Sequence, residues 1–416
     1  MPEFPEPGLL IHHPAYYAGS PLDVVMPAPP GSIPSDFEGL VHYTGQLFDA
    51  PLGSVLSTGP PYLTTVNNVI VWSNATSSLN ALAFLRASIQ PNTGQIGFRL
   101  GDVISLLIDL ETFLPAPGQA TARLIDSATR QIRFVATANA GTVEIGRSAE
   151  QDFIILAGGL PLQHRHRDDF FTEYADGYLP FLTAQPNPAP VVSYQPVWLY
   201  RLLNFPVVGK LVLHGIIMKA DGSQVALVPG SGLIPVRGQV AVFPAGPTEL
   251  NLPASAVQYH VWLQDDTGKR LSEVRSYVID RSPYQNPEII VFNNGLGGFD
   301  SLAFYGQGEA KARFSGETAI RVRPPGSPIN QRLHVQLNRY RSTEYTMRTG
   351  FLPEANWLNY LQSLLLSSDV RILRTGFYVP LRQASTELTL LSGVNRTLAA
   401  ELSFATETGE PYYFTD

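Results

Sequence analysis

The hydrophobic positions of this chain fall mostly into short runs that are rich in β-branched and aromatic residues and are separated by Gly, Pro, Asn and Asp. Short runs bounded by turn residues are typical of β-strands. Between residues 41 and 160 the expected strands are Leu63 to Trp72, Leu79 to Ile89, Gln95 to Leu100, Ala122 to Asp126 and Gln131 to Ala138. The pattern therefore predicts a first β-sandwich over residues 41–160.

One short helix interrupts this first set of strands. Behind Asp102, a candidate N-cap, apolar residues recur at helical spacing. They are Val103, Leu106, Leu107 and Leu110. We expect this helix, over Asp102 to Phe113, to cross an end of the first sandwich.

A second set of strands predicts a smaller, immunoglobulin-like sandwich over residues 206–283. The expected strands are Lys210 to Lys219, Gln224 to Val228, Gln239 to Phe243, Val257 to Gln264 and Arg270 to Ile279. Asp265-Asp266-Thr267-Gly268 between the last pair indicates a hairpin loop. Residues 161–205, rich in aromatic residues and Pro, are interpreted as a long connector, and such connectors are often functional or interfacial.

The C-terminal region, residues 284–416, mixes strands with one well-patterned helix and is expected to be an α+β domain. After Pro353-Glu354, apolar residues recur at three- and four-residue spacing, and Ser367-Ser368-Asp369 ends the helix. These apolar residues are Trp357, Leu358, Leu361, Leu364 and Leu365. The strands expected after the helix are Val370 to Leu373, Phe377 to Leu381, Thr386 to Leu391 and Ala399 to Ala405.

The most distinctive stretch is the glycine turn Asn293 to Gly298 between the strands Glu288 to Phe292 and Ser301 to Tyr305. Glycine allows positive φ and close approach of another backbone, so this stretch predicts a tight turn between two strands. It resembles a segment with the core NSLGGFD that recurs in tail proteins of phages and prophages of Bacteroidetes.

Weaker similarities to the same proteins lie upstream. They are Gly158-Gly159 after an apolar strand, then Phe181 to Pro186 (FLTAQP) and Gln195 to Tyr200 (QPVWLY). The family pattern is FLTWQP followed by QPxxLYY, and Ala184 stands where the family usually has Trp. The similarity runs in order over residues 95–380. It implies a virion or injection-machine component without a transferable active site.

Composition and charge refine this picture. The chain has 416 residues and no cysteine, which excludes disulfides, zinc-thiolate sites and thiol nucleophiles. We expect a mainly β, multidomain protein with two sandwiches followed by the α+β domain. The N-terminus shows neither a signal-peptide pattern nor an apolar run of membrane-spanning length, which predicts a protein made in the host cytoplasm without a membrane span.

Residues 1–40 are dominated by Pro and small residues but include several apolar ones, which predicts an extended arm that lies on a neighbouring subunit or domain. A disordered tail is the alternative. Residues 1–85 contain no Lys or Arg, whereas residues 311–348 contain eight Arg or Lys against two Glu. One hypothesis is that the acidic segment of one copy docks on the basic region of the next.

The basic run 311–348 has two further readings. It could bind DNA inside a channel. Alternatively, its arginines could form the solvent-exposed face of a strand in which Leu333, Val335 and Leu337 alternate with polar residues. The net charge of −7 disfavours nucleic acid as a partner.

Candidate chemistry is sparse. On an extended strand His164, His166 and Asp168 would share a face and could bind a divalent metal, but an exposed polar turn or a subunit contact is favoured. His12-His13 is a lesser candidate. No nucleophile elbow, phosphate-binding loop or dinucleotide fingerprint occurs, and we assign no catalytic, cofactor or metal residue.

The sequence thus predicts a non-enzymatic structural component of a phage tail, tail tip or baseplate. Its expected partners are copies of itself and other virion proteins, and its expected location is the virion. The alternative is a carbohydrate-binding adhesin or receptor-binding module that contacts host surface glycans. In that case the aromatic loop 170–200 would supply the sugar-stacking platforms.

Overall fold

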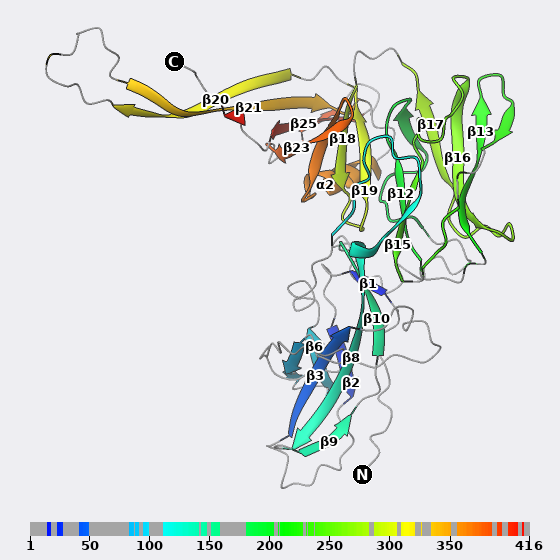
Figure 1. Cartoon of the computed structure of the whole chain (residues 1–416), viewed down its shortest axis with the longest axis vertical. Coiled ribbons are helices and arrows are strands. Elements are labelled where there is room, and N and C mark those ends of the chain that lie inside the picture. Colours follow the sequence, from blue (N-terminus) through cyan, green and yellow to red (C-terminus); the bar gives the residue numbers. More distant parts are fainter. Residues whose placement is uncertain are drawn as a thin grey trace.

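The computed structural model describes residues 15–17, 23–27, 41–49, 83–86, 88–90, 95–99, 111–140, 143–147, 151–158, 180–203, 207, 209–227, 230, 232–236, 238–282, 287–305, 309–320, 326, 334–350, 356–384, 389–392, 398–406 and 410–411. These residues form several mainly antiparallel sheets and one α-helix, arranged as in Figure 1. The prediction of a mainly β fold with sandwich-like units and a single clear helix is confirmed. None of the described helices has the length and apolar character that a membrane crossing requires.

The N-terminal unit contains a six-stranded sheet and a separate three-stranded sheet. The larger sheet is formed by β1 (Ala15–Tyr17), β10 (Gln151–Leu156), β8 (Thr129–Ala140), β3 (Val41–Asp49), β4 (Ala83–Arg86) and β9 (Val143–Arg147). The smaller one is formed by β2 (Asp23–Pro27), β6 (Gln95–Arg99) and β5 (Ser88–Gln90). The expected strand Leu63 to Trp72 and residues 102–110 of the expected helix lie outside the described residues, and residues 111–113 are not helical.

Part of the expected arm over residues 1–40 pairs within its own chain. Strand β1 pairs in parallel with β10, and β2 pairs antiparallel with β6, so both belong to sheets of the N-terminal unit. The interpretation allowed for a neighbouring subunit or a neighbouring domain, and these two strands lie on the neighbouring domain of the same chain. The remainder of residues 1–40 lies outside the described residues.

A β-sandwich follows, built from a five-stranded and a three-stranded sheet. The five-stranded sheet contains β11 (Ala189–Val192), β17 (Arg275–Asp280), β16 (Ala256–Asp265), β13 (Leu211–Lys219) and β14 (Gln224–Ala226). The three-stranded sheet contains β12 (Trp198–Leu202), β15 (Val240–Pro244) and β7 (Arg123–Ile125), the last followed by the 3-10 turn η3 (Asp126–Ala128). Burial alternates with period two along β13, as expected for a strand with one face on a core.

This sandwich begins earlier in the chain than the sequence suggested. Strands β11 and β12 lie within the expected connector, and β7 comes from the expected first sandwich. The reason is that β12 and β15 are buried at all five positions, because apolar layers cover both of their faces. Such strands read as continuous apolar runs without alternation, so their pairing could not be inferred from pattern.

The C-terminal region is a nine-stranded sheet. Its strands are β19 (Phe299–Phe304), β18 (Glu288–Asn293), β22 (Val370–Arg374), β23 (Phe377–Gln383), β25 (Leu398–Thr406), β21 (His334–Arg348), β20 (Glu309–Ile320), β24 (Thr389–Ser392) and β26 (Glu410–Pro411). Helix α2 (Asn356–Leu365) buries Trp357, Tyr360, Leu361 and Leu364 against this sheet, with the Tyr360 ring 5.4 Å from that of Phe292. This confirms the expected helix on a sheet.

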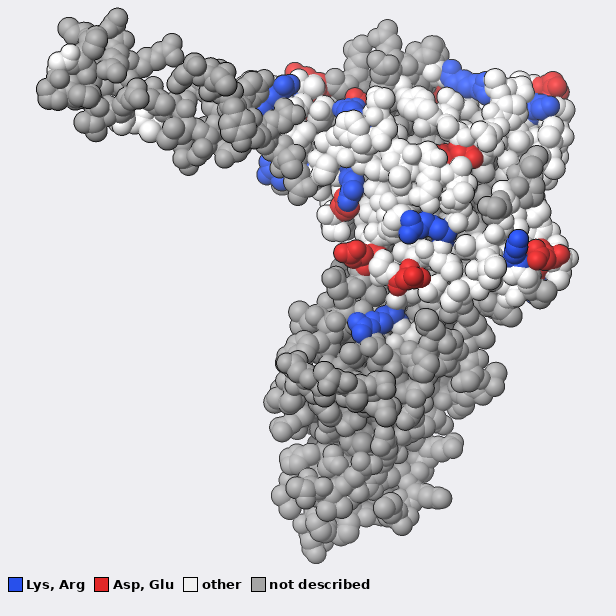
Figure 2. All heavy atoms as spheres, in the orientation of Figure 1, with Lys and Arg blue, Asp and Glu red and all other residues white. Residues whose placement is uncertain are grey.

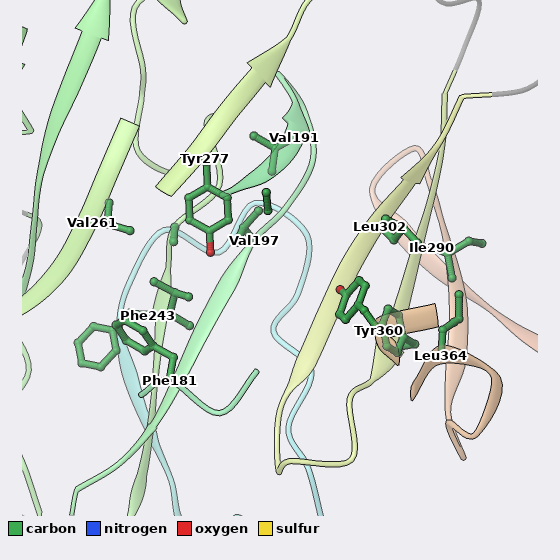
Figure 3. Packing of buried hydrophobic residues seen from close by; sticks show 14 of the residues in the cluster. Phe181, Val191, Val197, Phe243, Val261, Tyr277, Ile290, Leu302, Tyr360 and Leu364 are labelled. Carbon is green, nitrogen blue, oxygen red and sulfur yellow. The ribbon is translucent and has the colours of Figure 1, made fainter. Parts of the chain in front are cut away.

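The sandwich and the C-terminal sheet share one apolar core. Figure 3 shows Phe181, Val197, Phe243 and Tyr277 on the sandwich side, and Tyr360 with its neighbours on the other. Strands β20 and β21 form a long hairpin that extends away from this body (Figure 1). The described surface of the body in Figure 2 is largely uncharged, with scattered residues of both signs.

Candidate functional site

The glycine turn is the site that the sequence singled out, and the structure places it between β18 and β19, as predicted. The carboxamide oxygen of Asn294 accepts hydrogen bonds from the backbone N–H groups of Leu296 at 2.9 Å and Gly298 at 3.2 Å. Its amide nitrogen donates to the carbonyl oxygen of Leu182 at 2.8 Å. One buried side chain therefore holds the turn closed and ties it to the segment before β11.

Two of the glycines are required for different physical reasons. Gly297 has φ +91°, and a Cβ at this position would lie 2.7 Å from the carbonyl oxygen of Ala157. Gly298 does not have positive φ, contrary to our expectation for this turn, but its Cβ would lie 2.5 Å from the ring of Tyr200. Gly158, just after β10, lies equally close to the glycine turn, since a Cβ at this position would lie 2.3 Å from the carbonyl oxygen of Gly295.

Next to the turn lies a buried cluster of polar side chains, the polar junction, formed by Thr183, Gln185, Gln195, Arg275, Asp300 and Ser301. Thr183 donates its hydroxyl to Asp300 Oδ2 at 2.8 Å. The amide nitrogen of Gln195 donates to the carbonyl oxygen of Ser301 at 3.1 Å and to its hydroxyl at 3.0 Å. These bonds link the start of the sandwich to β19 of the C-terminal sheet.

Arg275 on β17 supplies the positive charge of the polar junction. Its guanidinium donates to the backbone carbonyl oxygens of Gln185 at 2.7 Å and Pro186 at 3.3 Å. Only 4% of Arg275 and 5% of Asp300 is exposed. Both groups are therefore removed from solvent, where charges are costly unless they are compensated.

Burial dominates the electrostatics of the polar junction. It raises the pKa of Asp300 to about 6, because the hydrogen bonds from Thr183 and Asn294 and the charge of Arg275 offset the lost hydration only in part. Burial likewise raises the pKa of Tyr277 to about 12 and shifts that of Tyr360 upward. A shifted carboxyl can mark an active site, but this one is enclosed by protein, so the arrangement positions segments and offers no surface to a substrate.

The sequence segments that carried the resemblance meet at this place. Gly158 contacts the glycine turn, Thr183 and Gln185 hydrogen-bond to β19, and Tyr200 donates its hydroxyl to the carbonyl oxygen of Phe113 at 2.8 Å. These segments are far apart in the sequence but lie close together in the folded protein. We did not predict Arg275 or Asp300 as members, and no local pattern marks them.

An open apolar cleft of about 650 Å³ lies beside strands β13, β14 and β15 of the sandwich. Its lining includes Leu211, Ile217, Phe243, Lys219 and Glu249. Among the described residues of this lining Glu249 is the one carboxylate, and burial raises its pKa.

Some of the other candidate residues lie within the described part of the chain and others do not. His164, His166, Asp168 and His12-His13 lie outside the described residues. Asp265 and Asp266 lie in a hairpin turn as expected, where Asp265 Oδ1 accepts from the N–H of Thr267 and Lys269, each at 3.0 Å. Within the described part of the chain, no group of three His, Asp or Glu side chains could hold a metal ion.

Residues 311–320 and 334–348 of the basic run lie in β20 and β21. Three of its cations pair with carboxylates of the chain: Arg313 with Glu344 at 2.6 Å, Arg348 with Glu401 at 2.7 Å and Lys311 with Glu309 at 3.0 Å. Arg321, Arg323 and Arg332 lie outside the described residues.

Three of the four described aromatic residues of the expected connector are part of the core. Phe181, Trp198 and Tyr200 are at most 2% exposed, whereas Tyr194 is 49% exposed. Residues 161–179, which hold Phe170, Phe171, Tyr174 and Tyr178, lie outside the described residues. Three of the proposed sugar-stacking groups are therefore unavailable to a ligand.

Comparison with known proteins gives no family assignment. No family model matches the chain, and no curated protein matches it significantly. Among solved structures, it is similar to a chain from the tail of an empty GTA particle with C6 symmetry, at 15% identity and a TM-score of 0.22, over 32% of this chain and 99% of that one. It is also similar to a marsupial T cell receptor, at 10% identity and a TM-score of 0.16, over 95% of this chain and 91% of that one. At these scores neither similarity identifies the function.

Proposed function

We propose that this chain is a structural component of a phage tail, tail tip or baseplate, or of a related injection machine. In this role it assembles with copies of itself and with neighbouring virion proteins. The observation that supports the proposal most directly is the hairpin of β20 and β21, which extends from the body (Figure 1) and exposes 69% of Phe314 and 72% of Ile320. Large apolar side chains presented on an extended element are typical of assembly contacts.

The polar junction supports the same role. It joins the sandwich and the C-terminal sheet through hydrogen bonds between residues more than 100 positions apart, such as Thr183 and Asp300. Buried hydrogen-bond networks favour one relative arrangement of the segments they join. A protein that transmits load or fixes the geometry of neighbours needs such rigid joints.

The carbohydrate-binding alternative is less well supported. Sugar recognition by stacking requires exposed aromatic faces, and in the described part of the loop only Tyr194 offers one, since Phe181, Trp198 and Tyr200 are buried. We therefore assign host attachment to the whole particle and not to the aromatic residues of this chain.

The test is to ask where the protein resides and in what form. Particles purified from a producing culture are analysed by quantitative mass spectrometry, and the isolated protein is imaged by electron microscopy. We expect the chain in the particles at a fixed number of copies, and rings, tubes or other multimers in the images. Absence from the particles, together with a monomer at all concentrations, would refute the proposal.

A further inference from the structure

Strand β20 is an open edge of the nine-stranded sheet. The strand at one end of this sheet, β19, is buried at all six positions and lies against β11 and β12. At the other end, residues 309–314 of β20 are exposed, and within the described residues this strand pairs only with β21. A long open edge presents unpaired N–H and C=O groups to any extended partner.

The two faces of β20 differ in character. Because side chains alternate along a strand, Ala310, Ala312 and Phe314 share one face, while Glu309, Lys311 and Arg313 share the other. Ala310 lies opposite Tyr345 of β21, and Tyr345 packs on the main core. The face that covers the core at the base of the hairpin thus continues outward as an exposed apolar face.

The sequence of β20 is complementary to itself in two antiparallel registers. A register centred on Ser315 pairs Arg313 with Glu317, but Arg313 already pairs with Glu344 of its own chain and Phe314 would face Gly316. A register centred on Phe314 brings the two exposed aromatic rings together, and aromatic cross-strand pairs are favourable. With Phe314 of one copy opposite Phe314 of another, Lys311 of each copy lies opposite Glu317 of its partner. In the same register Arg313 lies opposite Ser315 and Ala312 opposite Gly316, so no like charges face each other. A register centred on Arg313 would place two arginines opposite each other and Glu309 opposite Glu317, which is unfavourable.

We propose that β20 pairs antiparallel with β20 of a second copy, with Phe314 at the twofold axis. The pairing continues the sheet from one copy into the other and covers Phe314. This inference rests on the proposed self-association and names the surface responsible for it.

The absence of cysteine allows a direct test with the full chain. Residues directly opposite in an antiparallel pair have Cα atoms about 4.5–5.5 Å apart, which is within disulfide range. The variant Phe314→Cys is therefore expected to form a disulfide-linked dimer under mild oxidation, seen on a non-reducing gel. The control Leu366→Cys is 86% exposed but lies beyond helix α2, and it should stay largely uncrosslinked.

A charge swap tests the register itself. Lys311→Glu or Glu317→Lys alone converts two attractive cross-strand pairs into repulsive ones, which should raise the dimer dissociation constant by about tenfold or more. The double variant Lys311→Glu with Glu317→Lys restores opposite charges across the pair and should bind more tightly than either single variant, although the ion pair of Lys311 with Glu309 is still lost. Sedimentation velocity measures the constants, and unchanged thermal unfolding shows that the variants remain folded.

Two results would overturn the proposal. The first is that Phe314→Cys crosslinks no better than Leu366→Cys, and the second is that the double variant dimerises as weakly as the single ones. If the wild type still forms multimers in either case, self-association stands and another surface is responsible. A wild-type chain that stays monomeric, in solution and in particles, would remove both the surface and the function on which it rests.

Discussion

Replacing Asp300 by Asn should make the free energy of unfolding less dependent on pH. In the folded protein, burial raises the pKa of this carboxyl from 3.8 to about 6. The folded state therefore binds the proton more tightly than the unfolded state, so stability falls as pH rises from about 4 to 6 and stays reduced above that. A shift of this size corresponds to roughly 3 kcal/mol, at 1.36 kcal/mol per pKa unit.

The assay is urea unfolding at several pH values between 3.5 and 8, with wild type and variant compared at each. Asp300→Asn removes the ionisation but keeps an oxygen that can accept from Thr183. We expect the variant to gain stability relative to wild type as pH rises, by up to about 3 kcal/mol at pH 8. The gain is smaller to the extent that the new amide N–H groups lack acceptors.

Asp221→Asn is the control. The pKa of this exposed carboxyl is lowered by hydrogen bonds from Ser223, so its contribution to stability is present at neutral pH and is lost on acidification, the opposite sign. If the difference between Asp300→Asn and wild type stays constant from pH 4 to pH 7, the polar junction does not hold a carboxyl of raised pKa and the reasoning is refuted.

Three further substitutions test the glycine turn and its surroundings by chemical unfolding. Gly297→Val should destabilise by more than about 3 kcal/mol, because it combines positive φ with a Cβ 2.7 Å from the carbonyl oxygen of Ala157; a loss below 1 kcal/mol would show that the turn rearranges freely. Asn294→Ala should cost about 2–4 kcal/mol, since it removes the hydrogen bonds that close the turn, and wild-type stability would contradict this. Tyr200→Phe should lower the free energy of unfolding by about 1 kcal/mol, because the carbonyl oxygen of Phe113 loses its 2.8 Å donor. An unchanged midpoint of unfolding would show that water replaces the hydroxyl.

Local patterns predicted those parts of the fold whose signal is local. Strands β13 and β16 alternate with period two, the loop between β16 and β17 contains turn residues, and the helix after Pro353 shows its apolar stripe. The glycine turn was recognised because Gly295 and Gly297 require positive φ. In each case the physical cause lies within a few residues of its effect.

The remaining features depend on contacts that are distant in sequence. Trp198 to Leu202 reads as part of an apolar connector because both faces of β12 are covered, and nothing nearby identifies β15 as its partner. Thr183 and Asp300, which bond within the polar junction, are 117 positions apart. Their polar side chains read as surface residues, since the layer that buries them comes from other parts of the chain.

The pairing of β7 with β15 has a consequence for biosynthesis. Ile125 lies opposite Val240, so the partner of β7 leaves the ribosome about 115 residues later, a delay of roughly 6–20 s at ordinary elongation rates. During that time β7 has no strand beside it, and neither a fragment that ends near residue 160 nor one that begins near residue 180 contains both strands. The three-stranded sheet of the sandwich therefore cannot form before β15 is made, and a nascent chain stalled before that point would leave β7 without its partner strand.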